Sequence, residues 1–378
     1  MKSALKHSFC LLIAIALFTG CNKGGPNITK ATFGKLPDGR EVSMFTLVNA
    51  NGYKVRITDL GAKIVSLEAP DRNGKVADVV LGYDSLKQYL KGDKFYGSTV
   101  GRFANRIAKG HFKLDSVVYT LAINNAPNAL HGGPNGFHSV LWKGEIVQNA
   151  GYPALKLTYH SPDMEEGYPG NMDVTVMYTW AADNSLKIEY LATTDKNTVC
   201  NLTNHAIFNL RGAGNGDILM HEVMINADAF TPVDSTLIPT GELRPVKGTV
   251  MDFTTPTAVG KRITDSYEQL LKGKGYDHNY VLNNPGNIKT LAASVYEPES
   301  GRVLEVYTDQ PGLQFYSGNF LNGRDGGKAG NKYMFRTGLA LEAQKFPDAP
   351  NQPKFATTEL KKGEKYTQVT IYKFTTKK

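Results

Sequence analysis

Cysteine is scarce in this chain of 378 residues, which contains only Cys10, Cys21 and Cys200. A disulfide framework of the kind that holds small secreted domains together is therefore excluded. Blocks of like charge are missing too, because the 43 Lys and Arg and the 35 Asp and Glu residues are scattered along the chain. The net charge of +8 comes without the basic and aromatic stripe typical of nucleic-acid binding, so we expect no nucleic-acid partner.

The chain also lacks the short motifs of several large enzyme classes. It has no GxxxxGK[ST] phosphate loop, no CxxC pair, no HExxH zinc motif and no GxSxG nucleophile elbow. Residues 212–216, GAGNG, are rich in glycine, but they lack the flanking strand and helix of a dinucleotide site and predict a loop. No set of histidines has the spacing of metal ligands, so we expect no metal.

Long hydrophobic runs are absent after the N-terminal segment. Residues 11–18 form an apolar run of eight behind two lysines, too short for a transmembrane helix of roughly 20 residues. This pattern predicts a signal peptide over residues 1–20, and Cys21 after small residues resembles a bacterial lipoprotein signal. We expect a lipid on Cys21 as the only membrane contact, a tether over 21–27, and export to the periplasm or cell envelope. The alternative is ordinary cleavage that leaves a free thiol.

What the chain has in abundance is alternation of apolar and polar residues with period two. Residues 174–180, 185–193 and 303–308 are rich in β-branched and aromatic residues at alternate positions. Residues 56–67 predict two strands joined by a kink at Gly61. With 38 Gly and 18 Pro marking frequent turns, the pattern is typical of an all-β sandwich or barrel.

Helical patterns are few. Residues 84–92 and 265–273 each predict one or two turns of helix, the second with Asp265 and Glu268 as a capping pair. No repeat, long linker or alternation of strands with helices interrupts the chain, which indicates a single domain over residues 28–378.

Five polar clusters are candidates for chemistry: GRFANRI at 101–107, HGG at 131–133, TNHAIFNL at 203–210, YDHNY at 276–280 and LEAQKFPD at 341–348. Arginine carries rigid donors suited to sugar hydroxyls or a carboxylate, and a histidine beside two glycines is free to reach a ligand. Taken singly, each cluster also has an ordinary interpretation as an ion pair, a turn or a packed strand residue.

Taken together, the five clusters resemble the aldose 1-epimerase (galactose mutarotase) family in order and spacing. EEGYPGNM at 165–172 and GLQFYSGNF at 312–320 add two further matches, and the resemblance covers roughly residues 28–375. It implies a large, mostly antiparallel β-sandwich and an isomerase that interconverts the α and β anomers of free aldoses such as galactose and glucose. It also implies that no cofactor is required.

The resemblance further implies individual roles. The family's catalytic base falls on Glu342 and its catalytic acid on His205. Its substrate-binding residues fall on Asn105, Arg106, His131, Asp277 and Gln314. Ile207 departs from the family pattern, because an aromatic residue is common at that position.

Three other functions are open. A glycoside hydrolase would use two carboxylates, which Glu342 and Asp277 could supply, but it would not need His205. A non-catalytic carbohydrate-binding lipoprotein would be expected to lose His205 or Glu342, and both are present. An epimerase of phosphorylated hexoses conflicts with the predicted export.

Overall fold

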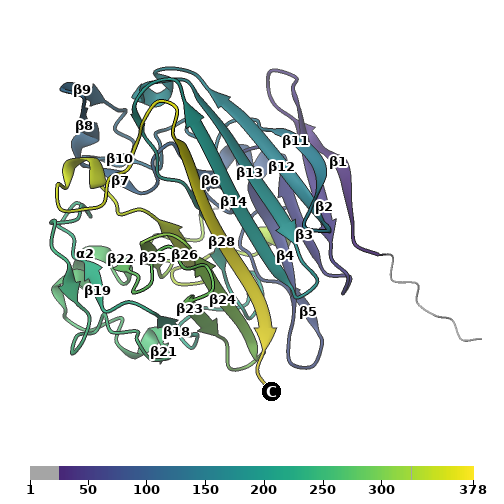
Figure 1. Ribbon diagram of the computed structural model, residues 1–378. Helices are drawn as coiled ribbons and strands as arrows, with labels where there is room; N and C mark the ends of the chain where they lie inside the picture. The colour runs from purple at the N-terminus through teal and green to yellow at the C-terminus, as the bar shows by residue number, and fades with distance from the viewer. Residues whose placement is uncertain (1–24, 325) are drawn as a thin grey trace, which may run out of the picture.

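Antiparallel strands make up most of the regular structure in the computed structural model, which describes residues 25–324 and 326–378. The predicted signal peptide, Cys21 and residues 22–24 lie outside this part of the chain. The strands form sheets of five, six and nine strands and four two-stranded sheets (Figure 1). The all-β prediction is confirmed.

Each of the three larger sheets has its own strand order, in which consecutive strands are hydrogen-bonded neighbours. The five-stranded sheet contains β1 (Asn27–Lys35), β2 (Glu41–Val48), β3 (Lys54–Thr58), β4 (Lys63–Pro70) and β5 (Val76–Asp78). The nine-stranded sheet contains β11 (Lys143–Asn149), β12 (Tyr152–Ser161), β13 (Met172–Trp180), β14 (Ser185–Thr194), β28 (Lys365–Thr376), β24 (Arg302–Thr308), β23 (Leu291–Tyr296), β18 (Glu222–Ile225) and β21 (Thr257–Ala258). The six-stranded sheet contains β17 (Ile207–Phe208), β26 (Leu339–Gln344), β25 (Gly312–Tyr316), β22 (Asp277–Val281), β19 (Ala229–Thr231) and β20 (Arg244–Pro245).

The smaller elements complete the described part of the chain. The two-stranded sheets pair β10 (Ala129–Leu130) with β7 (Arg106–Ile107), β15 (Thr198–Val199) with β27 (Glu359–Leu360), β16 (Thr203–Asn204) with β6 (Thr99–Val100), and β8 (His111–Leu114) with β9 (Val117–Thr120). The helices are α1 (Leu86–Lys91), α2 (Glu268–Gly273) and five 3₁₀ turns, η1 (Ala108–Gly110), η2 (Glu165–Gly167), η3 (Val259–Lys261), η4 (Lys328–Gly330) and η5 (Ala349–Asn351).

The nine-stranded sheet follows the predicted alternation. In β14, Leu186, Ile188, Tyr190 and Ala192 are buried and the residues between them are more exposed. The strands predicted at 174–180 and 303–308 are β13 and β24. The C-terminal strand β28, yellow in Figure 1, lies between β14 and β24, so strands distant in the sequence share one sheet.

The six-stranded sheet has its central strands buried on both faces. Every residue of β25 and β26 is buried, in contrast to the half-exposed strands of the nine-stranded sheet. In β26, Leu339, Leu341 and Ala343 join the main hydrophobic core, and the alternate residues Glu342 and Gln344 point to the opposite face. A polar face of a fully buried strand needs hydrogen-bonding partners or a ligand.

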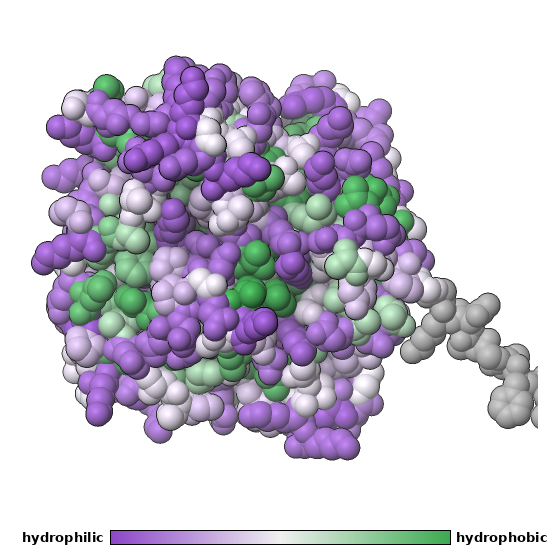
Figure 2. Space-filling view, viewed as in Figure 1, coloured by the Kyte–Doolittle hydropathy of each residue, from purple (hydrophilic) through white to green (hydrophobic). Residues whose placement is uncertain are grey.

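The two short helices lie where the sequence predicts them, but the predicted cap of α2 is wrong. The helix begins at Glu268 and its N-cap residue is Tyr267, so Asp265 lies before the first turn. Glu268 instead forms ion pairs with Arg244 and Lys272. In the described part of the chain, no helix has the length and hydropathy to cross a membrane. The face shown in Figure 2 is mostly hydrophilic, with hydrophobic residues in small groups.

Arg102, the first arginine of GRFANRI, is a structural residue. Its buried guanidinium donates hydrogen bonds to the hydroxyl and the carbonyl of Ser161 and to the carbonyls of Pro162, Pro169 and Gly170. These acceptors lie at the end of β12 and just before β13, so one side chain holds together the connection between the two strands. Arginine suits this position because its planar group presents several donors in a fixed geometry.

We expect Arg102→Met to lower the free energy of unfolding by about 3 kcal/mol or more, because several buried carbonyls lose their donors. Guanidinium unfolding followed by the fluorescence of the buried Trp142 and Trp180 measures the change. Arg40→Met is the control, since Arg40 is exposed and its ion pair is with exposed Asp38. Equal stability of the two variants would contradict a structural role for Arg102.

Candidate active site

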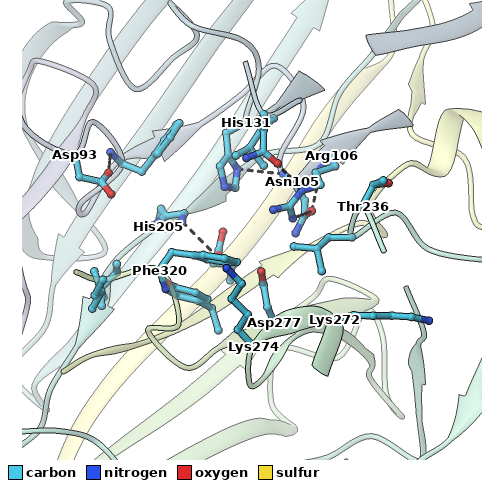
Figure 3. Close-up of a pocket in the computed structure, with 18 of the residues that line it drawn as sticks. Asp93, Asn105, Arg106, His131, His205, Thr236, Lys272, Lys274, Asp277 and Phe320 are labelled. Atoms are coloured by element: carbon cyan, nitrogen blue, oxygen red, sulfur yellow. Dashed lines mark hydrogen bonds and ion pairs between the residues drawn. The ribbon is translucent and has the colours of Figure 1, made fainter. Parts of the chain in front are cut away.

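The pairing of β17 with β26 brings the two predicted catalytic residues together. Ile207 lies opposite Ala340 in this antiparallel pair. Continuing the register by two residues places His205 opposite Glu342, and both residues line the same cavity, in which Figure 3 labels His205. His205 Nε2 lies 3.8 Å from Glu342 Oε1, and the side chains are 12% and 3% exposed.

The neighbouring strands add two more predicted residues to the same face. Gln314 on β25 lies opposite Glu342 on β26, and Asp277 on β22 lies opposite Tyr316 on β25. Residues directly opposite each other in an antiparallel sheet project to the same side. Gln314 Nε2 donates to Asp277 Oδ1 at 2.7 Å, which fixes the orientation of that carboxylate.

A second group of residues comes from the β7 and β10 pair, in which Arg106 lies opposite Leu130. Asn105 and His131 precede and follow these short strands, both with positive φ, 61° and 51°. They exchange two hydrogen bonds: the His131 N–H donates to the Asn105 carbonyl at 2.9 Å, and the Asn105 N–H donates to His131 Nδ1 at 3.2 Å. This exchange holds the imidazole at the wall of the cavity.

Arg106 is held by polar groups around its buried guanidinium. Its Nε donates to Asn125 Oδ1 at 3.1 Å, and its Nη1 lies 3.4 Å from Asn105 Oδ1. Its backbone carbonyl accepts from the N–H of Asp348, whose own Oδ1 accepts from the N–H of Ala108. The LEAQKFPD segment therefore contributes both Glu342 and the support of the strand that carries Arg106.

These elements enclose a cavity of about 410 Å³. Six of the seven residues predicted to act on substrate line it: Asn105, Arg106, His131, His205, Asp277 and Glu342. The seventh, Gln314, is buried and is not among the lining residues; its side chain donates to Asp277 and accepts from Gln344. Figure 3 shows His131, Asn105 and Arg106 on one side of the cavity and Asp277 and Lys274 on another, with His205 between His131 and Phe320.

Burial dominates the electrostatics of the two carboxylates. It raises the pKa of Glu342, and the negative charge of Asp277 adds to this effect, whereas His205 and Arg106 oppose it. Burial also raises the pKa of Asp277, against the effects of Arg106 and the hydrogen bond from Gln314. The positive charge of Arg106 therefore favours the ionised form of both carboxylates.

Burial, together with the charges of His205 and Arg106, holds the pKa of His131 well below its usual value, which favours the neutral imidazole. Since its Nδ1 accepts the N–H of Asn105, its Nε2 must carry the proton. Nitrogen and oxygen atoms of His131, His205 and Glu342 lie within 4.8 Å of one another, as metal ligands would. A metal at His131 would, however, need a free lone pair that the hydrogen bond from Asn105 already uses, so these residues do not fit a metal site.

The predicted catalytic pair, His205 and Glu342, has unused hydrogen-bonding capacity. His205 Nδ1 and Glu342 Oε2 are buried and make no hydrogen bond within the described residues. Buried polar atoms without partners are rare in folded proteins and need an explanation. An interaction with substrate would explain these two atoms, because their hydrogen-bonding partners would then arrive only when substrate binds.

Sequence reasoning missed the aromatic wall of the cavity. Phe95, Tyr316 and Phe320 line it, and the ring of Phe95 lies 4.9 Å from that of His131 and 5.8 Å from that of His205. Tyr316 and Phe320 belong to the GLQFYSGNF match, in which the resemblance gives a role only to Gln314. Thr236 and Lys274 also line the cavity, from loops with no motif that would have indicated them.

Comparisons with known proteins agree with this geometry. A sequence model of the aldose 1-epimerase family matches residues 43–373. The chain is 46% identical over 348 residues to galactose mutarotase of Bos taurus, covering 92% of this chain and 98% of that one. It is 38% identical over 340 residues to aldose 1-epimerase of Escherichia coli (strain K12), covering 89% and 96%.

Solved structures show the same fold. An aldose epimerase homologue from C. elegans superimposes with a TM-score of 0.81 at 33% identity, covering 89% of this chain and all of that chain. A galactose 1-epimerase from Lactobacillus acidophilus gives a TM-score of 0.82 at 26% identity, with 94% and 100% coverage. The predicted galactose mutarotase-like sandwich is confirmed. The chain is therefore an isomerase that belongs to the aldose 1-epimerase family.

Proposed function

We propose that this cavity interconverts the α and β anomers of free aldoses such as galactose and glucose, with Glu342 as the base and His205 as the acid. The observation that carries the proposal is the buried pair of an imidazole and a carboxylate, 3.8 Å apart, at the wall of a polar cavity. Ring opening of a pyranose needs one group to take a proton and another to give one. The two side chains supply both.

The reaction balances without a cofactor. Ionised Glu342 takes the proton of the C1 hydroxyl while protonated His205 gives a proton to the ring oxygen, so the C1–O5 bond breaks and an aldehyde forms. Rotation about C1–C2 presents the other face of the carbonyl. The C5 hydroxyl then attacks C1, returns its proton to His205, and the carbonyl oxygen takes the proton held by Glu342.

The surrounding residues hold the rest of the sugar while C1 moves. His131 Nε2–H and the guanidinium of Arg106 are donors for sugar hydroxyls, and the carboxylate of Asp277 is an acceptor. Asn105 orients His131 through its backbone, and Gln314 orients Asp277. Gln314 therefore assists binding through Asp277. These contacts keep the open chain in place, so that re-closure competes with release.

Polarimetry of freshly dissolved α-D-galactose and α-D-glucose tests the activity. We expect the wild-type protein to speed the approach to the same final rotation, and Glu342→Gln and His205→Asn each to lower kcat/KM by roughly 10²- to 10⁴-fold. Glu189→Gln and His160→Asn are the controls, since both residues lie outside the cavity lining. No acceleration with any common aldose would refute the proposed function, and an active Glu342→Gln variant would refute that residue's role.

The pH dependence gives a second test. Glu342 acts as a base only when ionised, so activity falls as the pH drops through its raised pKa. Arg106→Met removes a positive charge that opposes this rise, so the pKa of Glu342 rises further. We expect the acidic limb of the profile of kcat/KM against pH to move to higher pH in this variant.

Arg72→Met serves as the control for that shift, because Arg72 is exposed and its guanidinium contacts the carbonyl of Pro298 rather than the cavity. Its profile should coincide with that of the wild type. An acidic limb that stays in place, or moves to lower pH, in Arg106→Met would contradict the assignment of Glu342 as the base.

We also propose that the protein is an exported lipoprotein, anchored through Cys21 at the periplasmic side of the cell envelope. The support is the sequence of residues 1–21, with its lysines, short apolar run and small residues before the cysteine. At this location the enzyme would equilibrate single anomers released by sugar-degrading enzymes before their uptake.

Fractionation of bacterial cells that express the full chain tests the anchor. We expect the protein in the membrane fraction with a lipid on its N-terminal peptide by mass spectrometry, and Cys21→Ala in the soluble fraction with unchanged mutarotation, because the substitution removes only the acylated thiol. Cys200→Ala is the matched control, since Cys200 is buried and should not affect fractionation. A membrane-bound Cys21→Ala protein from which residues 1–20 have been cleaved would contradict the lipid anchor.

A further inference from the structure

Lys63, the first residue of β4, is a buried lysine that the proposed mechanism does not use. The residue is only 1% exposed. The ammonium donates to three oxygens: the carbonyl of Lys94 at 2.8 Å, the hydroxyl of Ser98 at 2.7 Å and the carbonyl of His138 at 2.5 Å. An ammonium has three N–H donors, and all three are used.

Two of these acceptors belong to the turn at residues 94–98, which clamps the backbone of the catalytic histidine. The Gly97 N–H donates to the His205 carbonyl at 2.9 Å, and the His205 N–H donates to the Ser98 carbonyl at 2.8 Å. The Ser98 hydroxyl in turn donates to the Lys94 carbonyl at 2.9 Å, which closes the turn on itself. A single hydrogen-bonded chain therefore runs from the Lys63 ammonium through Ser98 to His205.

The same turn carries Phe95, which packs against the imidazoles of the site. Its ring centroid lies 5.8 Å from that of His205, 4.9 Å from that of His131 and 4.6 Å from that of His138. The third acceptor of Lys63 is the carbonyl of His138, so the lysine joins the segment after HGG to the turn that carries Phe95. Movement of this turn would shift the backbone of His205 and the Phe95 ring that packs against its imidazole.

The Lys63 ammonium needs a glycine beside it, and burying its charge is unfavourable. Gly61 has φ of 69°, and a Cβ there would lie 2.7 Å from Lys63 Nζ and 2.2 Å from the His138 carbonyl oxygen. Desolvation lowers the pKa of Lys63 to about 7, which reflects the unfavourable burial of its charge. A hydrophobic side chain would avoid this cost but could not hold three acceptors.

We infer that Lys63 is a positioning residue for the proposed acid His205: by binding the Lys94, Ser98 and His138 oxygens, it holds the turn that fixes the imidazole against Glu342. The inference rests on the proposed role of His205. It concerns a residue outside the cavity lining and outside every cluster that resembles the family.

Lys63→Met is the main test, because it keeps the length of the side chain and removes the donors. We expect kcat for mutarotation to fall by about 10-fold or more with KM within about twofold, since a small displacement of the acid affects proton transfer more than binding. Amide hydrogen exchange at His205 should also become faster. Lys328→Met is the matched control: Lys328 is a buried lysine bonded to Asp78 and Val80 but outside the cavity lining, so its loss should lower Tm and leave kcat unchanged.

Ser98→Ala removes one acceptor without removing a buried charge, and it keeps the test decisive if Lys63→Met fails to fold. It should lower kcat by a smaller factor and also speed exchange at His205. An unchanged kcat in Lys63→Met or in Ser98→Ala would overturn the inference. So would a fall in kcat that Lys328→Met shows as well at a comparable loss of Tm. If the wild type itself shows no mutarotation, the proposed function fails, while exchange at His205 still reports whether Lys63 holds that residue.

Discussion

The register of the six-stranded sheet is the constraint on which the rest of the site depends. Successive residues of a strand project to opposite faces, so a slip of one residue would place Leu341 in the cavity and Glu342 in the hydrophobic core. The same register sets Glu342 beside Gln314 and, through β17, opposite His205. The leucines on the other face stabilise this register, because they pack into the main core.

The residues of the site come from two kinds of element, the buried strands of the six-stranded sheet and the ends of two short strands. The carboxylates of Glu342, the proposed base, and of Asp277 project from buried strands. Asn105, Arg106 and His131 instead lie at the ends of two short strands, and two of these residues have positive φ. Burial makes each charged group costly, and the opposite charges of Arg106 and the carboxylates offset part of that cost. The buried ammonium of Lys63 is balanced differently: it donates to two carbonyls and a hydroxyl rather than to a carboxylate.

Two residues of the same type in one motif can have different roles, which depend on the groups that surround each side chain in the fold. GRFANRI contains two buried arginines; Arg102 binds carbonyls between β12 and β13, whereas Arg106 lines the cavity. The predicted cap at Asp265 is wrong for a related reason: α2 begins three residues later, where Glu268 pairs with two cations. A local pattern predicts which residues are polar and where strands alternate, but it does not identify partners distant in the chain.

The sequence by itself determined the all-β class, the positions of strands such as β14 and the family, because alternation is local and the seven matched segments are specific in combination. Those segments also contain the six predicted residues that line the cavity. The sheet order, the position of Gln314 behind Asp277, the aromatic wall and the contacts of Lys63 were decided only by the tertiary structure. Each of these depends on strands and turns that are far apart in sequence and meet only when nonlocal pairing sets their register.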